Sequence, residues 1–338
     1  MIKKTLDKLL DGKGLSFDEA VNTADLLMKG EVNNSQTAAL LTLLKVKGET
    51  PTEIAGFATA MKNNGIKIKT DLSNTMDVCG TGGDNSDSFN ISTAVAFVVA
   101  AAGIKVAKHG NRSITSKSGS SDVLSALGIK IDLTPEQSEK ALKKIGISFL
   151  FAPIYHPAMK NVAPVRRELG FRTIFNMLGP LTNPAGTVKQ IIGTFNNEAS
   201  LKMAEAAKIL GMEHVAFICT NNRYDEITLS HPTRIIELNK NELTDFEITA
   251  ETFGSEKISL DKIAGGTPEE NAKIIEEIFT SGNRDARMKV VAANAAMALF
   301  ISGNSNSLNT AMQRAEEIIL SGAAMKKLNE LKYFSEEL

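Results

Sequence analysis

Apolar residues in the first part of the chain repeat with the period of an α-helix. Leu6 and Leu10 lie one turn apart on the same helical face. A capping-box spacing begins a second helical pattern at Ser16, and Pro51 occupies a first helical position at the start of a later one. No part of this segment alternates with a period of two. The pattern therefore predicts a small N-terminal helical domain over residues 1–72.

From residue 73 onward, short apolar runs alternate with helical patterns. Strand-like runs fall at residues 76–79, 105–107, 147–151, 190–194 and 214–220, and a hairpin-like pattern falls at 228–249. Long amphipathic helices are expected at 268–280, 285–300 and 308–320. Such alternation is typical of βαβ units. We therefore expect an α/β protein whose larger domain, residues 73–338, has a mostly parallel central sheet flanked by helices.

Composition and charge narrow the class of protein. The 38 basic and 39 acidic residues leave a formal net charge of −1, which gives no field for non-specific binding of nucleic acid. The longest apolar stretch, 94–103, is about half the roughly 20 residues that a membrane span requires. Two lone cysteines cannot form a disulfide framework. We expect a cytoplasmic protein that binds neither nucleic acid nor membranes.

Two segments near the first expected strand can bind an anion. Gly80-Thr-Gly82-Gly83-Asp84 follows the strand directly, and its glycines let backbone N–H groups converge on a negative charge. A simple turn is the alternative, and Asn85 stands where a dinucleotide fingerprint needs its third glycine. Asn90-Ile91-Ser92-Thr93 begins the next helix. These residues are either ordinary helix caps or part of an anion site at the helix N-terminus.

A third loop follows the second expected strand. It runs through Lys108-His109-Gly110-Asn111-Arg112 to Ser116 and Ser120, and its spacing excludes a P-loop. A solvated loop can have the same composition. However, the carboxyl ends of parallel strands are where open α/β sheets bind ligands. Three such loops together favour a polyphosphate ligand.

Charged residues farther along the chain suggest a metal site and a carboxylate site. Asp225 and Glu226 are adjacent in an expected loop, where both side chains can converge, although surface acids are common. Near phosphates, such a pair is a candidate site for Mg²⁺. Arg166, expected on a helix, is either solvated or a partner for a substrate carboxylate. The four histidines lack the spacing of a metal site.

The motifs GTGGD, NIST, KHGNR, Pro164-Val-Arg166-Arg-Glu and FNMLGPLTNP occur in this order along the chain. Together they resemble the anthranilate phosphoribosyltransferase family, within the nucleoside-phosphorylase-like class, over essentially the whole chain. The resemblance implies contacts with phosphoribosyl pyrophosphate at Gly80, Gly83, Asp84, Asn90, Ser92, Thr93, Lys108 and Ser120. It implies contacts with anthranilate at Gly80, Asn111 and Arg166, and magnesium ligands at Ser92, Asp225 and Glu226. We add Ser88, Ile91, His109, Gly110, Arg112 and Ser116 to the expected substrate-binding residues.

The reaction implied by the resemblance moves the 5-phosphoribosyl group to the amine of anthranilate and releases pyrophosphate. Negative charge builds on the leaving group, so Lys108 and Mg²⁺ are expected to stabilise it. The amine is uncharged at neutral pH, so no catalytic acid or base is expected. The family also implies a homodimer formed through the helical domain, with residues 164–182 packing against that domain.

The glycine loop departs from the family pattern. Asn85 and Asp87 stand where glycines are common, and Ser88 stands where threonine is usual. We expect the Asp87 side chain to point outward, because a negative charge would weaken an anion site. The alternatives are a pyrimidine nucleoside phosphorylase, a paralogous transferase with another acceptor, or a non-catalytic nucleotide- or nucleic-acid-binding relative.

Overall fold

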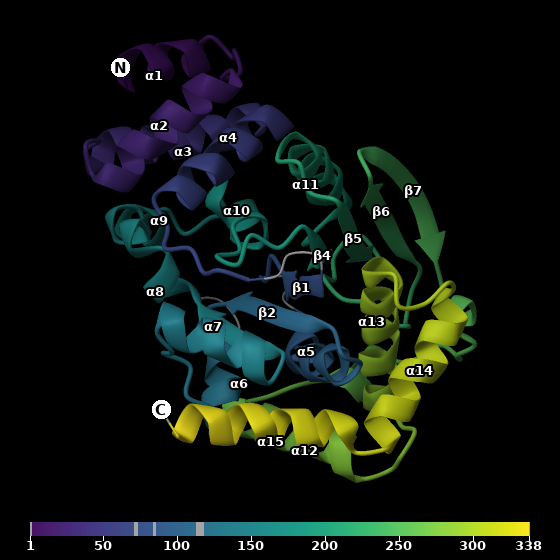
Figure 1. Cartoon of the computed structure of the whole chain (residues 1–338). Helices are drawn as coiled ribbons and strands as arrows, with labels where there is room; N and C mark the ends of the chain where they lie inside the picture. Colours follow the sequence, from purple (N-terminus) through teal and green to yellow (C-terminus); the bar gives the residue numbers. More distant parts are fainter. Residues whose placement is uncertain (1, 71–73, 84–85, 113–117, 338) are drawn as a thin grey trace.

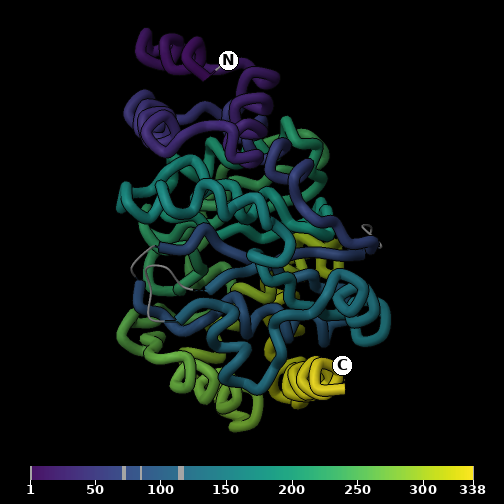
Figure 2. Tube along the Cα trace, turned by 90° about the vertical axis from the view of Figure 1, so that its left-hand side faces the viewer, coloured from purple at the N-terminus to yellow at the C-terminus, as the bar shows by residue number. Residues whose placement is uncertain are grey.

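The computed structural model describes residues 2–70, 74–83, 86–112 and 118–337 of the chain. Helices form one end of the molecule, and a larger part built around a β-sheet forms the rest (Figure 1). Figure 2 shows the N-terminal helices and the C-terminal helix at opposite ends. The expected class, an α/β protein with a small N-terminal helical domain, is confirmed.

The N-terminal bundle consists of α1 (Ile2–Leu10), α2 (Phe17–Lys29), α3 (Asn34–Lys47) and α4 (Pro51–Asn63). The expected capping box is present at α2: the Glu19 amide donates to the Ser16 hydroxyl at 3.3 Å, and the Ser16 amide donates to the Glu19 carboxylate at 2.8 Å. At Gly56, an added Cβ would lie 2.6 Å from the Cβ of Ala20. Glycine therefore allows α4 to cross close to α2.

Two short helices from the middle of the chain pack against this bundle. Helix α9 (Ala163–Leu169) contacts α3, and α10 (Phe175–Leu181) contacts α4. The rings of Phe57 and Phe175 meet edge to face with centroids 6.0 Å apart. Apolar side chains of both short helices belong to the same buried cluster as the bundle.

The central sheet has seven strands in the order β3-β2-β1-β4-β5-β6-β7. The strands are β1 (Thr75–Gly80), β2 (Lys105–Gly110), β3 (Ile147–Phe151), β4 (Lys189–Gly193), β5 (His214–Thr220), β6 (Thr233–Asn239) and β7 (Glu242–Ile248). The first five pair in parallel, while β6 and β7 form an antiparallel hairpin at the edge. The mostly parallel sheet and the hairpin are both as expected.

Helices bury both faces of the sheet. The helices of the α/β part are α5 (Ile91–Ala101), α6 (Ser120–Ala126), α7 (Pro135–Lys144), α8 (Ala152–Tyr155), α11 (Asn197–Ile209), α12 (Pro268–Thr280), α13 (Ala286–Ser302), α14 (Leu308–Leu320) and α15 (Ala323–Glu336). In β5, Ala216 and Ile218 pack in one apolar cluster with α5 and α13, whereas Val215 and Phe217 pack in a second cluster with α4 and α11. Short 3₁₀ helices occupy Pro157–Asn161, Ala250–Phe253 and Leu260–Ile263.

Three of these helices, the single-turn α8 together with α11 and α15, were not among the expected elements. Helix α11 buries mainly alanines, including Ala199, Ala204 and Ala207, so it lacks a strong apolar stripe. Within the ranges that the structure describes, no helix combines the length and apolar character needed to cross a membrane.

Candidate active site

The expected site loops gather at one edge of the sheet. Strands β1, β2 and β4 end at Gly80, Gly110 and Gly193, and all three run in parallel, so their carboxyl ends share that edge. The glycine loop follows β1, the KHGNR strand end belongs to β2, and the acidic pair follows β5. The fold thus brings together segments that are far apart in the sequence.

The glycine loop lies against Asp225. Gly82 and Gly83 have positive φ values of 66° and 71°, a conformation that suits glycine. The Gly82 amide donates to Oδ2 of Asp225 at 3.0 Å. A Cβ added at Gly80 would lie 2.6 Å from the same oxygen, and one added at Gly193 would overlap the Asp225 carbonyl. Gly193 was not predicted as a site residue, but its lack of a side chain lets Asp225 approach.

Glu226 reaches the beginning of α5. Its Oε1 accepts a hydrogen bond from the Ser92 amide at 3.2 Å. The loop that presents it is held from both sides: the Thr220 hydroxyl donates to the Glu226 carbonyl at 2.6 Å, and the Ile227 amide donates to Oδ1 of Asn294 at 3.0 Å. The two acidic side chains thus each bond to the backbone of a segment that was expected to bind an anion. No local sequence pattern predicted that the buried Asn294 on α13 would support this loop.

The residues around the start of α5 differ in what they present to the site. Asn90 is not a side-chain cap. Its side-chain Nδ2 instead donates to the Ser118 carbonyl at 3.2 Å, and its Oδ1 accepts from Nδ2 of Asn271 at 2.9 Å, so capping by the side chain is wrong for this residue. The side chains of Ile91 and Thr93 are buried, each with 1% exposure, which leaves only their backbone for a ligand.

Lys108 is almost fully buried, with 4% exposure. Its Nζ donates to the Val78 carbonyl at 2.6 Å and to the Ser92 hydroxyl at 3.2 Å. The ammonium group therefore lies between β1 and the start of α5, where the Ser92 amide also donates to Glu226. This placement puts a positive charge within the candidate anion site.

His109 and His156 lie together, although their spacing in the sequence gave no hint of it. Their ring centroids are 5.1 Å apart, and Nδ1 of His109 lies 3.2 Å from the Gly179 carbonyl. Burial, aided by the neighbouring His156, lowers the pKa of His109 to about 3. Burial also lowers the pKa of His156 to about 4. Both imidazoles are therefore neutral at physiological pH.

Arg166 on α9 faces an aromatic ring. Its guanidinium carbon lies 5.4 Å from the centroid of Phe175, and burial lowers the pKa of this half-buried group. Among the described residues, no acidic side chain forms an ion pair with it. The adjacent Arg167 is exposed. Arg166 is thus available to a carboxylate from outside the protein.

Several of the remaining expected residues lie at the end of β2, just after it, or at the start of α6. The Asn111 carbonyl accepts from the Ser121 amide and the Ser120 hydroxyl, each at 3.4 Å. A Cβ at Gly110 would overlap Ser120 Oγ. The Arg112 guanidinium lies 6.0 Å from the Phe151 ring centroid.

The described part of the glycine loop continues through residues 86–90. Ser88 forms an antiparallel bridge with Ala264. Asp87 is exposed, as expected, and has a positive φ of 51°. Asp84 and Ser116 lie outside the described residues.

One contact of the glycine loop was not expected. Arg172, in the segment between α9 and α10, donates a hydrogen bond to the Gly83 carbonyl. Its guanidinium carbon also lies 4.4 Å from the ring centroid of Phe195. The α9–α10 segment therefore touches the glycine loop directly.

The oxygen donors at this edge fit magnesium better than a softer metal. Asp225 and Glu226 supply carboxylates, and Ser92, whose amide bonds to Glu226, supplies a hydroxyl. Mg²⁺ typically takes one or two carboxylates together with phosphate oxygens. In the part of the chain that the structure describes, no group of three or more His, Cys, Asp or Glu side chains forms a ready-made metal site. The pair therefore suits an ion shared with a phosphate ligand.

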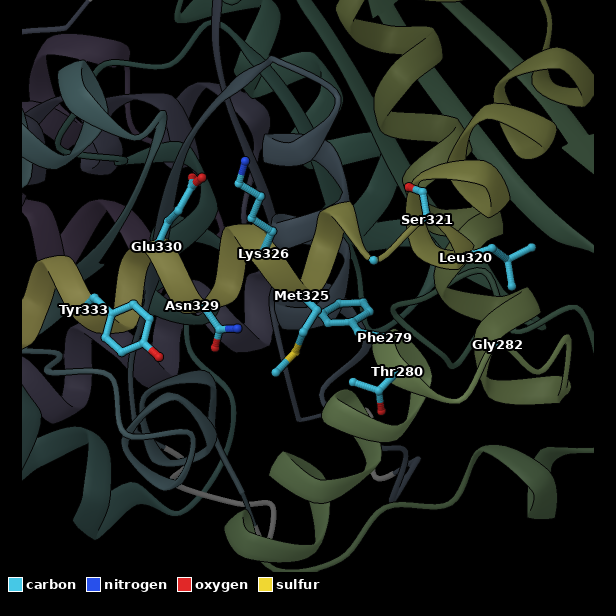
Figure 3. A pocket seen from close by; sticks show the side chains of 11 residues that line it. Phe279, Thr280, Gly282, Leu320, Ser321, Met325, Lys326, Asn329, Glu330 and Tyr333 are labelled. Carbon is cyan, nitrogen blue, oxygen red and sulfur yellow. The ribbon is translucent and has the colours of Figure 1, made fainter.

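A separate groove of about 630 Å³ lies between α12, α14 and α15 (Figure 3). Its lining includes Phe279, Met325 and Tyr333. None of its lining residues belongs to the candidate site.

Comparison with known proteins agrees with this arrangement. Residues 72–325 match the α/β domain of a glycosyl transferase family, and residues 3–65 match the helical bundle domain of the same family. The anthranilate phosphoribosyltransferase of Acetivibrio thermocellus is 44% identical over 335 residues, which cover 99% of this chain and 97% of the relative.

Solved structures are similar over the same length. The crystal structure of anthranilate phosphoribosyltransferase from Thermus thermophilus is 38% identical, with a TM-score of 0.92 over 98% of this chain and 99% of that one. The Saccharomyces cerevisiae enzyme, in complex with PRPP and Mg, is 26% identical, with a TM-score of 0.91 over 100% of this chain and 98% of that one. The chain belongs to the anthranilate phosphoribosyltransferase family, as its motifs predicted.

Proposed function

We propose that the protein transfers the 5-phosphoribosyl group of phosphoribosyl pyrophosphate to the amine of anthranilate, giving N-(5-phosphoribosyl)anthranilate and pyrophosphate in tryptophan biosynthesis. Full-length similarity to relatives of that name supports this function. The observation that carries it is the meeting of the acidic pair with two anion-binding elements: Asp225 with the glycine loop and Glu226 with the start of α5. A diphosphate and a divalent cation require this combination.

The donor is proposed to bind along the glycine loop, the start of α5 and the end of β2. The glycine loop and the first turn of α5 suit phosphate oxygens because the glycines have no side chain and the side chain of Ile91 is buried. The Gly82 and Ser92 amides, which here bond to Asp225 and Glu226, would turn to phosphate oxygens when the two carboxylates bind the cation. Lys108 would neutralise the charge that develops on the departing pyrophosphate. It is held in place beforehand by its bonds to Val78 and Ser92, so little reorganisation is needed during the reaction. The proposed donor-binding residues within the described ranges are Gly80, Gly83, Ser88, Asn90, Ile91, Ser92, Thr93, Lys108, His109, Gly110, Arg112 and Ser120.

Asp225, Glu226 and the Ser92 hydroxyl would hold Mg²⁺ together with the diphosphate. When bound, the ion supplies positive charge that stabilises the leaving group. The yeast relative forms a complex with both PRPP and Mg, which supports this proposal.

The acceptor is proposed to bind between the glycine loop and α9, near Gly80, Asn111 and Arg166. The Arg166 guanidinium offers a carboxylate a planar pair of donors, and its contact with Phe175 limits how it can turn. Arg166 would thus orient anthranilate so that the amine faces the ribose. Because that amine is uncharged at neutral pH, the transfer does not require a strong general base.

The proposed assembly is a homodimer formed through the helical domain, which would comprise residues 1–72 together with the segment 164–182. Four large apolar side chains on this part of the molecule are exposed: Leu10 on α1, Val46 on α3, Ile66 after α4 and Phe171 after α9. Large exposed apolar side chains are candidates for burial in an interface between subunits. Light scattering coupled to size exclusion tests this assembly, which a monomer at micromolar concentration would contradict. We also propose a cytoplasmic location.

The decisive experiment follows the fluorescence of anthranilate. Its consumption is expected only when the protein, phosphoribosyl pyrophosphate and Mg²⁺ are all present. Phosphorolysis of thymidine or uridine is measured in parallel. No anthranilate consumption together with nucleoside phosphorolysis would replace the proposed function with that of a phosphorylase.

A further inference from the structure

Strands β1 and β2 separate partway along their length. They pair only at Thr75 with Lys105 and at Met76 with Val106. Beyond that point β1 continues to pair with β4 as far as Gly80, while β2 continues to pair with β3 as far as Gly110. The edge of β2 that faces β1 therefore loses its ladder partner just before Lys108.

Two buried side chains take the place of the missing ladder. Nδ2 of Asn183 donates to the Ala107 carbonyl at 2.8 Å, and Oδ1 of Asp77 accepts from the His109 amide at 3.3 Å. The same Asn183 nitrogen donates to Oδ2 of Asp77 at 2.7 Å, which joins the two side chains. The peptide groups on both sides of Lys108 are thus held by side chains.

This pair also connects the two halves of the site. Asp77 belongs to β1, whereas Asn183 follows α10, the helix whose Gly179 carbonyl faces His109. Lys108 crosses the separation in the other direction, since its Nζ donates to the Val78 carbonyl, next to Asp77. One carboxylate therefore links the lysine on the donor side with the α10 segment on the acceptor side.

Burying the Asp77 carboxylate costs desolvation free energy, which its hydrogen bonds must offset. The residue has 0% exposure and Asn183 has 4%, so neither can replace its hydrogen bonds with bulk water. Burial raises the pKa of Asp77 to about 6, against the opposing effects of Lys108 and of the Asn183 and His109 donors. The His109 amide and Nδ2 of Asn183 each donate to a different oxygen of Asp77, so both oxygens must act as acceptors. An ionised carboxylate supplies both, while a carboxamide of the same shape supplies only one.

We propose that Asp77, acting with Asn183, is a positioning residue for the transfer reaction: it holds the end of β2 away from β1 and so fixes Lys108 and the α10 segment relative to each other. The proposal rests on the proposed function. Asp77 itself does not touch substrate in this role; it acts through the backbone on either side of Lys108.

The test compares Asp77→Asn with a matched control, Ser148→Ala. Ser148 is also fully buried and lies opposite Ala107 in β3, and its Oγ has no hydrogen-bond partner among the described residues. Asp77→Asn is expected to lower kcat by about tenfold to a hundredfold, because small misplacements of reacting groups have effects of that order. Calorimetric affinity for phosphoribosyl pyrophosphate with Mg²⁺ is expected to stay within about threefold of wild type, since Lys108 acts mainly on charge that develops in the transition state and the Gly82 and Ser92 amides keep their bonds to the acidic pair. Ser148→Ala is expected to leave kcat unchanged.

A double-mutant cycle with Asn183→Ala separates positioning from general stability. If the two side chains act as one unit, the double variant loses no more kcat than either single variant. An Asp77→Asn protein that keeps the kcat of the Ser148→Ala control would overturn the inference. If Asn183→Ala does not fold, the comparison of Asp77→Asn with Ser148→Ala is sufficient to test the inference. A wild-type protein without anthranilate transfer would instead overturn the proposed function, and the inference with it.

Discussion

The Gly82 amide donates a hydrogen bond to Oδ2 of Asp225 at 3.0 Å, across 143 positions of sequence. A similar hydrogen bond runs from the Ser92 amide to Oε1 of Glu226. In both cases a carboxylate of the protein meets an N–H group of the kind that binds phosphate. The acidic pair, the glycine loop and the start of α5 are therefore joined by hydrogen bonds, so that a change to one of them is felt by the others.

Removing the charge of the acidic pair is expected to abolish magnesium-dependent turnover. In Asp225→Asn with Glu226→Gln, the side chains keep their size but lose the charge that a divalent cation requires, so kcat is expected to fall by roughly a hundredfold or more. The rate is measured against Mg²⁺ concentration, and circular dichroism checks the fold. Glu276→Gln with Glu277→Gln removes the same charge from two exposed positions on α12 and serves as the control. Unchanged magnesium dependence in the first variant would discard the metal assignment.

A single methyl group at Gly80 is expected to disturb the same contacts. The Cβ of Gly80→Ala would lie 2.6 Å from Oδ2 of Asp225, which is closer than nonbonded atoms approach, so the carboxylate must move. We expect the KM for phosphoribosyl pyrophosphate to rise about tenfold, or about 1.4 kcal/mol. Gly14→Ala is the control, because its Cβ would meet its nearest neighbours at 3.6 and 3.7 Å, in ordinary contact. Equal KM values in the two variants would show that Asp225 can shift without consequence.

The pattern of apolar residues predicted most elements of the fold because those elements are strongly periodic. Helix α5 and strands β1 to β5 are apolar runs bounded by turn residues, and their order indicated a parallel sheet. Helix α11 was missed because alanines such as Ala204 bury little apolar area and produce no clear stripe.

The site was predictable only where its residues stand in motifs. The glycine loop, Lys108 and the acidic pair could be found in this way. The proximity of His109 and His156, the space at Gly193 for Asp225 and the bond from Asn183 to Asp77 could not. Each of these contacts joins segments that only the folded sheet brings together, and neither residue type nor local spacing encodes them.

Arg166 is expected to act on the acceptor much more than on the donor. A charged hydrogen bond is typically worth about 1.5–3 kcal/mol, so Arg166→Ala should raise the KM for anthranilate by roughly tenfold to a hundredfold. The KM for phosphoribosyl pyrophosphate should change by no more than about twofold. Steady-state kinetics with each substrate varied in turn measure both values. Arg167→Ala, one position along α9 but exposed, is the control. A similar rise in both KM values for Arg166→Ala would contradict a specific role in binding the acceptor.

The buried histidines are expected to make the protein sensitive to acid. In the unfolded chain an imidazole titrates near its ordinary pKa of about 6.5. In the folded protein, burial lowers the pKa to about 3 for His109 and about 4 for His156. Between the folded-state pKa of each histidine and about 6.5, the unfolded chain binds more protons than the folded protein. The contribution of the two histidines to the free energy of unfolding therefore falls as the pH drops below about 6.5. Asp77 acts in the opposite direction up to its pKa of about 6, because its folded form holds the proton more tightly.

Replacing one histidine isolates its contribution, since the effect of Asp77 is common to both proteins at each pH. His156→Gln is expected to be less stable than wild type at pH 7.5, because it disturbs close packing beside Gly65 and His109. That difference should shrink or reverse by about pH 5, where the wild type must keep an imidazole uncharged that the unfolded chain protonates. Urea unfolding followed by circular dichroism at the two pH values measures it, with exposed His231→Gln as the control. A stability difference that stays constant between the two pH values would mean that His156 titrates alike in the folded and unfolded chains.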